Sequence, residues 1–349
     1  MISVVMPSYN ASAFIAEAIE SILNQTFQEL ELIIVDDGSI DDTVEIIQRH
    51  RYRDQRLRLI QIQHGGICQA LNTGIKASKY GWIARMDADD IAVPTRLEKQ
   101  MKAAIANPNV VVWGSYVHHL SLTGEVLSLQ RQGPLTEHEF YSLKEAGEIP
   151  FVIHPTMFYK KDALLAVGGY DSQIALAQDL DLLSRLTEYG PILTVPEPLL
   201  LYRMHQKSSS MEKFFAQQFF SRYIVARHHA RLNGTPLPVL DAFKQAEANT
   251  PFIAQFSQKV HLWGQFYYRK AGLHVAEKKY WRGGFYLSLA IATHPTYAIQ
   301  RLWQQKFSPE ARRALKQVST SAGNSHPELD RSPQYAHLSR PQSLPNSRR

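Results

Sequence analysis

The sequence predicts an α/β protein in which a mostly parallel sheet, covered by helices on both faces, precedes a helical region and a disordered tail. In the N-terminal part, short apolar segments alternate with segments of helical periodicity. The apolar segments are continuous, as in strands that are buried on both faces. From about Met211 on, strand patterns stop and long helical segments follow. We therefore expect an α/β domain over residues 1–210, a basic helical region over 211–318 and a disordered tail over 319–349.

Each expected element follows from its local pattern. The apolar residues between Phe14 and Leu23 recur at helical spacing, and Pro94 stands where proline suits the first turn of a helix. The tail is rich in Ser, Pro, Asn and Arg and has too few apolar residues to form a packed core. In chain order the expected elements are the strand Ile2–Met6, a helix over 14–23, the strand Leu32–Val35, a helix capped by Asp41 or Asp42, the strand Leu57–Ile62, the helix Ala70–Ala77, the strand Trp82–Met86, a helix from Pro94 to Ile105, and helices over Phe214–His229 and Lys278–Ala292.

The composition limits the class of protein. With 349 residues, 44% of them apolar and 20% charged, the chain is typical of a globular protein with two domains or with one large domain plus appendages. The single cysteine, Cys68, excludes an internal disulfide framework and favours a reducing compartment. The chain opens directly on a strand pattern, and no segment reaches the roughly 18 apolar residues of a spanning helix. These observations favour a cytoplasmic protein.

The charge is divided unevenly along the chain. Residues 1–210 hold 18 Lys and Arg against 25 Asp and Glu, a formal charge of −7, whereas residues 211–349 hold 20 against 7, or +13. A basic second part favours an anionic partner. No zinc-finger, RNP or helix-turn-helix pattern accompanies the charge, so we do not expect nucleic acid. Tyr280, Trp281 and Phe285 lie among these cations, and we expect peripheral contact with the anionic inner face of the plasma membrane. The alternative is that these aromatic residues pack the helical region against the sheet domain.

Two clusters of acids follow predicted strands, at the edge where open α/β sheets bind ligands. Asp36-Asp37-Gly38-Ser39 ends the second strand, where a carboxylate can accept hydrogen bonds from a base or a ribose. The alternative is a plain turn and helix cap. Asp87-Ala88-Asp89-Asp90 ends the fourth strand, and carboxylates this close repel one another unless a cation or solvent offsets their charge. We expect Mg²⁺ or Mn²⁺ there in preference to a solvated acidic loop.

A third acidic pair and two histidines leave alternatives open. Asp179 and Asp181 fall in the first turn of a helix, where an Asp is often only a cap, and where it could also act as a general base. From the residues alone the cap is favoured. His154 and His205 could each be a ligand or an ordinary hydrogen-bonded residue, and Cys68 is expected to pack as a small apolar residue.

The order of these segments resembles the large bacterial family of inverting glycosyltransferases with the GT-A fold, often called family 2. The resemblance covers residues 1–210 and implies a Rossmann-like α/β fold for that part. The matching segments are Val4-Val5-Met6-Pro7-Ser8-Tyr9-Asn10, Ser21-Ile22-Leu23-Asn24-Gln25-Thr26, Ile34-Val35-Asp36-Asp37-Gly38-Ser39, Ala70-Leu71-Asn72-Thr73-Gly74-Ile75, Ala84-Arg85-Met86-Asp87-Ala88-Asp89-Asp90, Gly168-Gly169-Tyr170-Asp171, Gln178-Asp179 and Tyr202-Arg203-Met204-His205.

The resemblance implies a role for the residues that bind the donor nucleotide. Pro7, Tyr9, Asn10 and Asp37 would bind the nucleotide, with Asp37 accepting a hydrogen bond from the base. Asp87 would contact the ribose or the metal.

The resemblance also implies a metal site and a base. Asp89 would bind the metal together with Asp87, His205 would reach the metal or the diphosphate, and Asp179 would be the catalytic base. Two departures are present. Gln178 stands where the family usually has Glu, which alters the surroundings of the base. His64 and Leu71 stand where the family often has Asn and Arg, so the donor-phosphate contacts of those residues are not implied here.

The expected function is therefore transfer of a sugar from a UDP-, dTDP- or GDP-sugar to a saccharide or lipid-linked acceptor hydroxyl, in cell-envelope polysaccharide or glycolipid synthesis. A single in-line displacement would invert the anomeric centre. Two alternatives are a sugar nucleotidyltransferase, whose glycine-rich basic phosphate loop is missing from residues 7–12, and a non-catalytic sugar-nucleotide or glycan-binding protein. An aspartyl-phosphate phosphatase is disfavoured because its Asp-x-Asp pattern is missing from the first strand.

Overall fold

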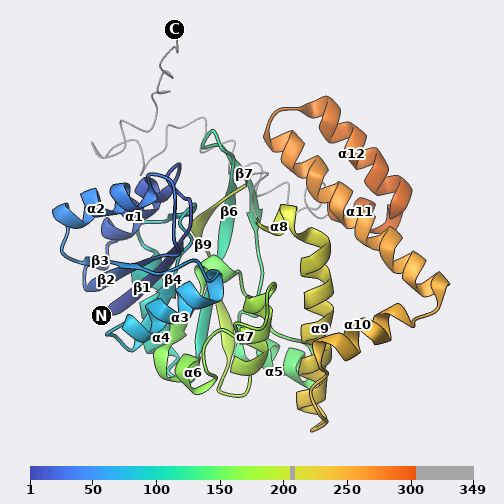
Figure 1. Cartoon of the computed structure of the whole chain (residues 1–349), viewed down its shortest axis with the longest axis horizontal. Helices are drawn as coiled ribbons and strands as arrows, with labels where there is room; N and C mark the ends of the chain where they lie inside the picture. Colours follow the sequence, from blue (N-terminus) through green and yellow to red (C-terminus); the bar gives the residue numbers. More distant parts are fainter. Residues whose placement is uncertain (205–208, 304–349) are drawn as a thin grey trace.

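One sheet runs through the N-terminal part of the protein in a computed structural model, which describes residues 1–204 and 209–303 (Figure 1). Over these residues the sheet has nine strands in the order β3-β2-β1-β4-β8-β6-β9-β5, and β7 pairs with β6. The strands are β1 (Ile2–Ser8), β2 (Leu30–Asp36), β3 (Leu57–Gln61), β4 (Trp82–Arg85), β5 (Ile91–Ala92), β6 (Val112–Leu120), β7 (Val126–Gln130), β8 (Phe158–Lys160) and β9 (Ile192–Arg203).

The first four long strands are parallel, as predicted. β1 lies between β2 and β4, with Val5 opposite both Ile33 and Arg85. β1 continues two residues past the predicted end at Met6, to Ser8. Pro7 is tolerated there because β4 pairs with β1 only as far as Val5, so no strand on that side needs the missing amide.

The second half of the sheet mixes directions and was not predicted strand by strand. β6 and β9 are parallel, whereas β8 runs antiparallel to β4 and β6, β7 is antiparallel to β6, and the short β5 is antiparallel to β9. The fold is nevertheless the expected α/β arrangement with a mostly parallel sheet.

Helices cover both faces of the sheet. In β2, Ile33 and Val35 point to one face and pack with Ala70 of a helix that follows β3. Leu32 and Ile34 point to the other face and join the main core. The helices of this part are α1 (Ile15–Leu23), α2 (Thr43–Arg53), α3 (Ile67–Ala77), α4 (Arg96–Ala106), α5 (Glu137–Glu145), α6 (Lys161–Ala166) and α7 (Gln178–Leu186), with a 3-10 turn over His154–Thr156.

The C-terminal part of the described chain is helical, as predicted. The predicted helices Phe214–His229 and Lys278–Ala292 correspond to α9 (Phe214–Leu232) and α12 (Tyr280–Thr293). The other helices are α8 (Ser209–Glu212), α10 (Leu240–Ala248), α11 (Phe252–Ala276) and α13 (Pro295–Leu302). The predicted tail over 319–349 and the end of the helical region, 304–318, lie outside the described residues.

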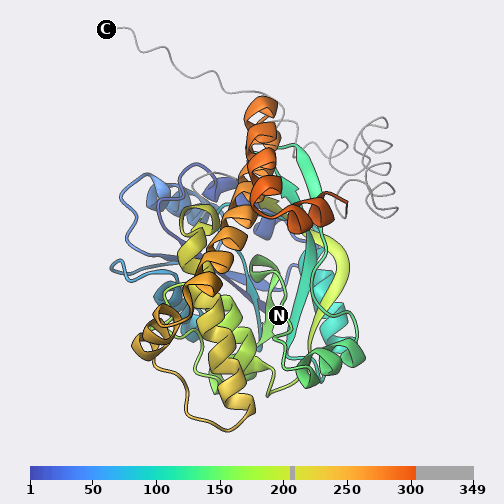
Figure 2. The same ribbon diagram turned by 90° about the vertical axis from the view of Figure 1, so that its right-hand side faces the viewer.

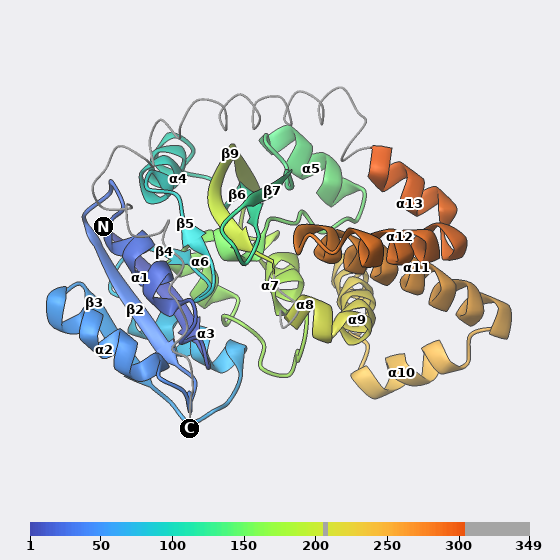
Figure 3. The same cartoon turned by 90° about the horizontal axis from the view of Figure 1, so that it is seen from above.

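Two further views show how the C-terminal helices sit. When the right-hand side of Figure 1 faces the viewer, α9 and the antiparallel pair α11 and α12 lie in front of the sheet (Figure 2). From above, they lie on the side of the molecule opposite α1, α2 and α3 (Figure 3). Within the described part of the chain, no helix is both long enough and apolar enough to cross a bilayer.

Candidate active site

Three parallel strands deliver the predicted site residues to one edge of the sheet. β1 ends at Ser8, β2 at Asp36 and β4 at Arg85, and the loops that follow carry Tyr9, Asp37 and the acids from Asp87 on. Because the carboxyl ends of parallel neighbours coincide, residues that are far apart in sequence meet at this edge.

The loop after β2 places Asp37 in a buried position with backbone partners. Its Oδ1 accepts from the amide of Gly65 at 2.8 Å and its Oδ2 from the amide of Gly66 at 2.9 Å. The Nδ1 atom of His64 lies 3.0 Å from Oδ2 as well. The ring of Tyr9 stacks on the His64 ring with centroids 4.3 Å apart, so an aromatic surface adjoins the carboxylate.

Asn10 connects the loop after β1 to the loop after β2. The backbone amide of Asn10 donates to Ser39 Oγ at 2.9 Å, and its side-chain Oδ1 accepts from the backbone amide of Ile40 at 2.9 Å. Asn10 adopts a left-handed backbone conformation with φ of 49°, which Asn tolerates better than most residues. Pro7 is buried in β1 immediately before these loops.

The acids after β4 form a compact cluster. Asp87, Asp89 and Asp90 each offer one carboxylate oxygen, and the three oxygens lie within 4.8 Å of one another. Burial raises the pKa of Asp87 and, more strongly, that of Asp90, and the neighbouring carboxylates raise both further.

Asp90 is the most buried acid of this cluster, with 1% of its surface exposed. Its Oδ1 accepts from the amide of Arg203 at 2.9 Å, but no described residue donates to its Oδ2. The Arg203 guanidinium donates to the carbonyl oxygen of Asp89 at 2.9 Å and to Glu17 at 2.6 Å. The last residue of β9 therefore fixes the acidic loop in place.

Arg85 lies behind the cluster and was not predicted as a site residue. Its Nη1 lies 2.6 Å from Oδ2 of Asp87, and its Nη2 contacts Oδ1 of the same carboxylate. The side chain is only 3% exposed, and its Nε has no partner among the described residues. The sequence contained a signal for this pair, because Arg85 ends an apolar strand two residues before Asp87 and a buried arginine almost always pairs with an acid.

A second buried arginine, Arg96, also supports the end of β4. It donates from Nη2 to the carbonyl oxygen of Arg85 at 2.6 Å and from Nε to Gln100 at 3.2 Å. Burial and the charge of Arg85 lower the pKa of Arg96 to about 9. Arg85 and Arg96 together place positive charge beneath the acidic cluster.

Asp179 lies in the first turn of α7 and is partly buried. Its Oδ1 accepts from the amide of Leu180 at 2.9 Å. Burial raises the pKa of Asp179 above its usual range, and the Leu180 amide and the charge of Arg85 offset only part of the rise. The charge of Arg85 thus acts on the pKa of both Asp179 and Asp87.

Asp181 has a different environment from Asp179, two residues away. It is fully buried and pairs with Arg185, whose Nη2 lies 2.8 Å from Oδ2. Its other oxygen lies 3.4 Å from Nη2 of Arg231. Asp181 is therefore an ion-paired residue of the protein interior.

His154 and Cys68 have structural environments, whereas His205 is not described. His154 hydrogen-bonds through Nε2 to the Tyr170 hydroxyl at 2.8 Å, and burial lowers its pKa well below the usual value, so it is a neutral hydrogen-bonded residue. Cys68 is buried, and burial raises its pKa to about 11, which agrees with a packing role. His205, the predicted third metal ligand, lies outside the described residues.

Comparison with known sequences identifies relatives of the chain. The sequence model described as Glycosyl transferase family 2 matches residues 3–168. Over 219 residues the chain is 33% identical to the O-antigen biosynthesis glycosyltransferase WbnJ of Escherichia coli, with 60% of this chain and 82% of WbnJ covered. It is 28% identical over 218 residues to the chondroitin synthase of Escherichia coli, with 62% of this chain and 31% of the synthase covered.

Two solved structures share the fold. S. aureus TarS in complex with UDP-GlcNAc superposes with a TM-score of 0.50 and 18% identity, covering 83% of this chain and 91% of that one. The mannosyltransferase PcManGT from Pyrobaculum calidifontis, in complex with GDP-Man and Mn²⁺, superposes with a TM-score of 0.50 and 18% identity, covering 92% and 80%.

The fold, the acidic edge and these relatives define a glycosyltransferase with the GT-A fold, which confirms the predicted fold and the predicted class of enzyme. The similarity to WbnJ extends over most of that protein's length, so the family is also settled. The chain belongs to glycosyl transferase family 2.

Proposed function

We propose that the chain is an inverting glycosyltransferase that moves a sugar from a nucleotide-diphosphate sugar to an acceptor hydroxyl. The observation that supports this most directly is the position of Arg85, which pairs with Asp87 and whose charge also offsets part of the rise in the pKa of Asp179. A carboxylate suited to removing a proton therefore lies near an acidic cluster suited to the donor diphosphate. Membership of family 2 favours this reaction over nucleotidyl transfer and over non-catalytic binding of a sugar nucleotide or glycan.

The donor nucleotide would bind at the ends of β1 and β2. The Tyr9 ring, stacked on His64, offers a surface for a base, and the Asp37 carboxylate has lone pairs beyond those used by the amides of Gly65 and Gly66. A carboxylate acceptor suits a base that presents N–H donors, as uracil, thymine and guanine do. Asn10 would hold the two loops of the nucleotide pocket together, and Pro7 would form the floor of the pocket. UDP-GlcNAc in TarS and GDP-Man in PcManGT support a UDP-, dTDP- or GDP-sugar as donor.

The residues after β4 fit a divalent cation. Carboxylate oxygens are the ligands that Mg²⁺ and Mn²⁺ prefer, and those of Asp87, Asp89 and Asp90 are close enough to share one ion. The buried Oδ2 of Asp90, which lacks a donor among the described residues, is the second observation that favours a cation. When bound, Mg²⁺ or Mn²⁺ would offset the charge that develops on the departing diphosphate. Asp87 and Asp89 are the proposed ligands, with His205 as a further one.

Asp179 would act as the general base. Burial raises the pKa of Asp179 above its usual range, which makes the carboxylate a stronger base than an exposed Asp. As the acceptor oxygen attacks the anomeric carbon, its proton passes to Asp179 and the bond from that carbon to the diphosphate oxygen breaks. One displacement from the face opposite the leaving group inverts the anomeric centre.

The acceptor is proposed to be a saccharide or a lipid-linked saccharide of the cell envelope, reached by peripheral contact with the inner face of the plasma membrane. α12 carries a single charged residue, Arg282, and exposes Trp281 and Phe285, of which Trp281 is 88% exposed. Lys278 and Lys279 precede this helix and pair with Glu125 and Glu277 at 2.7 Å. An aromatic surface therefore stands beside lysines that could exchange these acids for anionic headgroups, as in helices that lie in an anionic interface. This exposure argues against the alternative that Trp281 packs the helical region against the sheet.

A donor screen tests the proposed function. Purified protein is incubated with UDP-, dTDP- and GDP-sugars and Mg²⁺ or Mn²⁺, and release of the nucleoside diphosphate is measured with and without saccharide acceptors. We expect sugars of one nucleotide class to be hydrolysed or bound. NMR of the product should show that the configuration at the anomeric carbon is inverted. A product of retained configuration, or release of a nucleoside monophosphate, would contradict the proposal.

A further inference from the structure

The segment that carries Asp179 packs on the C-terminal helices. Ile174 and Ala177 form a small apolar cluster with Tyr223 and Ile224 of α9, separate from the main core. Leu180, which follows Asp179, packs against the same cluster, together with residues of α9 and α10. The residues on both sides of Asp179 are therefore in contact with a part of the chain that begins more than thirty residues later.

The backbone immediately before α7 is held in an unfavourable conformation. Ala177 has φ of 56° and ψ of 34°, in the left-handed region that residues with a Cβ rarely adopt. Such a residue keeps this conformation only where surrounding contacts impose it. Ala177 is buried in the cluster with Tyr223 and Ile224, so α9 supplies contacts that impose the turn into α7.

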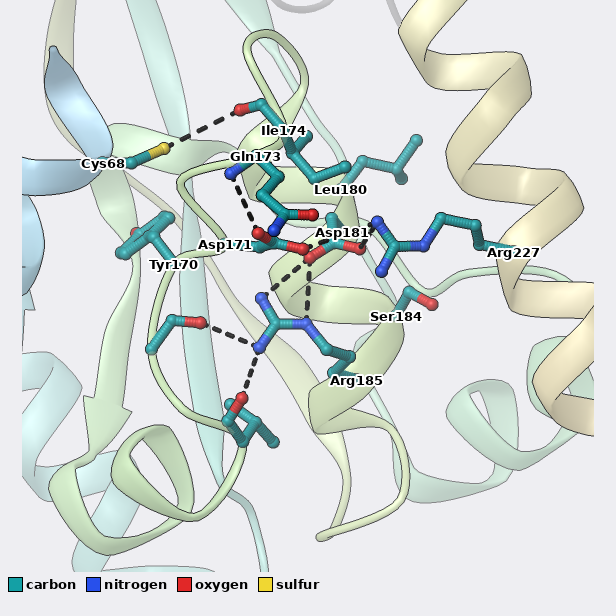
Figure 4. A network of polar contacts seen from close by, with 12 residues as sticks. Cys68, Tyr170, Asp171, Gln173, Ile174, Leu180, Asp181, Ser184, Arg185 and Arg227 are labelled. Atoms are coloured by element: carbon teal, nitrogen blue, oxygen red, sulfur yellow. Dashed lines mark hydrogen bonds and ion pairs between the residues drawn. The ribbon is translucent and has the colours of Figure 1, made fainter. Parts of the chain in front are cut away.

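A group of ion pairs reinforces this contact (Figure 4). Arg185 donates from Nε to Asp181 Oδ2 at 2.9 Å and from Nη1 to the carbonyl oxygens of Val167 and Gly169 at 2.6 and 2.8 Å. From α9, Nη2 of Arg231 lies 3.4 Å from Asp181 Oδ1, and Nη1 of Arg227 lies 4.0 Å from the same oxygen.

The same two α9 arginines reach other groups of the loop and of α7. Arg227 lies 3.5 Å from Asp171, at the start of the loop that leads into α7. Arg231 donates to Ser184 Oγ at 2.5 Å, and that hydroxyl also hydrogen-bonds to His228 Nδ1 at 2.9 Å. Since Asp181 is fully buried, its charge requires these partners.

We propose that Arg231 and Arg227 of α9 are positioning residues for the transfer reaction: acting through Asp181, they hold α7 so that Asp179 faces the acceptor. The inference rests on the proposed role of Asp179 as base. Arg231 contacts Asp181 and Ser184 of α7, and Arg227 contacts Asp171, Asp181 and the Tyr223 ring of α9, so we assign both a positioning role and no catalytic one. Both arginines lie in α9, beyond residues 3–168 that match the family model, as do Asp179 and Asp181.

The first test compares two arginines of the same helix. Arg231→Gln removes a contact to Asp181, whereas Arg222→Gln, the control, removes a two-point ion pair with Glu247 of α10 at 2.7 and 2.8 Å. With the donor chosen by the screen, we expect Arg231→Gln to lower kcat at least tenfold while leaving the donor KM and the affinity for the matching nucleoside diphosphate within twofold. Arg222→Gln should leave all three within twofold, and Arg231→Lys should recover part of kcat. Equal effects of Arg231→Gln and Arg222→Gln would overturn the proposal.

A double-mutant cycle tests whether Arg231 acts through Asp181. If it does, Arg231→Gln should change kcat less than twofold in an Asp181→Asn background, because the partner charge is already absent. Independent, multiplying effects of the two substitutions would contradict this route.

Hydrogen exchange provides a readout that does not depend on turnover. Amides of residues 174–186 should exchange at least tenfold faster in Arg231→Gln than in the wild type or in Arg222→Gln. Unchanged exchange would overturn the positioning role even if activity fell. A wild-type protein that transfers no sugar would refute the proposed function, whereas the exchange experiment would still decide whether α9 anchors this segment.

Discussion

Arg85 and Asp87 form a two-point ion pair at the end of β4, with Nη1 of the arginine 2.6 Å from Oδ2 of the acid. The arginine is 3% exposed and the acid 24% exposed. Arg85→Gln should therefore leave a poorly solvated carboxylate without its partner. We expect the free energy of unfolding to decrease by about 3 kcal/mol. This is the low end of the cost of removing one partner from a buried ion pair, because Asp87 is partly exposed.

Chemical denaturation measures this change against an exposed pair. Arg49→Gln removes the pair with Glu45 on α2, whose side chains are both mostly exposed, and should change the free energy of unfolding by less than about 1 kcal/mol. If the two substitutions have the same effect, Arg85 does not support the acidic loop as described.

Asp179 and Asp181 should respond differently to neutral replacement. Asp179→Asn is nearly isosteric but cannot take a proton, so kcat should fall at least ~10²-fold with donor affinity unchanged. Asp181→Asn should lower the free energy of unfolding, since it leaves the partly buried Arg185 and Arg231 without their acid. Asp179→Asn should not lower stability at pH 7, because a carboxyl whose pKa is raised on folding destabilises the fold when it is ionised.

The pH profile separates the two acids further. The pKa of Asp179 lies above its ordinary value of 3.8, so kcat/KM should decrease as the pH falls through that raised pKa and the base becomes protonated. The profile of Asp181→Asn should keep this acidic limb, whereas the residual activity of Asp179→Asn should lose it. An acidic limb that persists in Asp179→Asn would assign the base to another group.

Metal dependence is expected to require Asp89. Asp89→Ala should abolish Mg²⁺- or Mn²⁺-dependent donor turnover and leave the circular dichroism spectrum unchanged, because a loop carboxylate is lost and no core residue is changed. Asp162→Ala, at an exposed acid of α6, is the control and should keep full activity. Wild-type activity in excess chelator, or in Asp89→Ala, would exclude the metal assignment.

Membrane contact is expected to depend on α12. In co-sedimentation with liposomes, binding of the full chain should require anionic lipid, weaken as salt is added, and decrease at least fivefold in Trp281→Ser. Tyr52→Ser, at a similarly exposed aromatic residue on α2, should bind like the wild type. Equal recovery in the supernatant with and without anionic liposomes would refute the contact.

The parts of the fold that were predicted from sequence are those with strong local patterns. β1, β2 and β4 are continuous apolar runs followed by turn residues, which local pattern alone reveals. β5 has two residues and β8 has three, too few for a pattern to emerge, and both are antiparallel strands defined by their partners.

The site was predictable to a similar extent. The acids after β4 were evident from the sequence, but the local pattern alone did not distinguish Asp179 from Asp181, since both fall in the first turn of α7, and only the family resemblance favoured Asp179. What separates them is burial of Asp181 against Arg231, fifty residues further along. Contacts across such a distance depend on how helices pack, which the pattern within either helix does not encode.

The dependence of α7 on α9 has a consequence for recombination between related transferases. The segment from Tyr170 to Leu186 contributes the acids, and helix α9 the arginines, of three ion pairs. A chimera joined at residue 210 would combine acids and arginines that had not evolved together. A junction after α10, near Pro251, would transfer both halves as one unit. Exchange of acceptor preference between homologues should therefore succeed more often at the later junction.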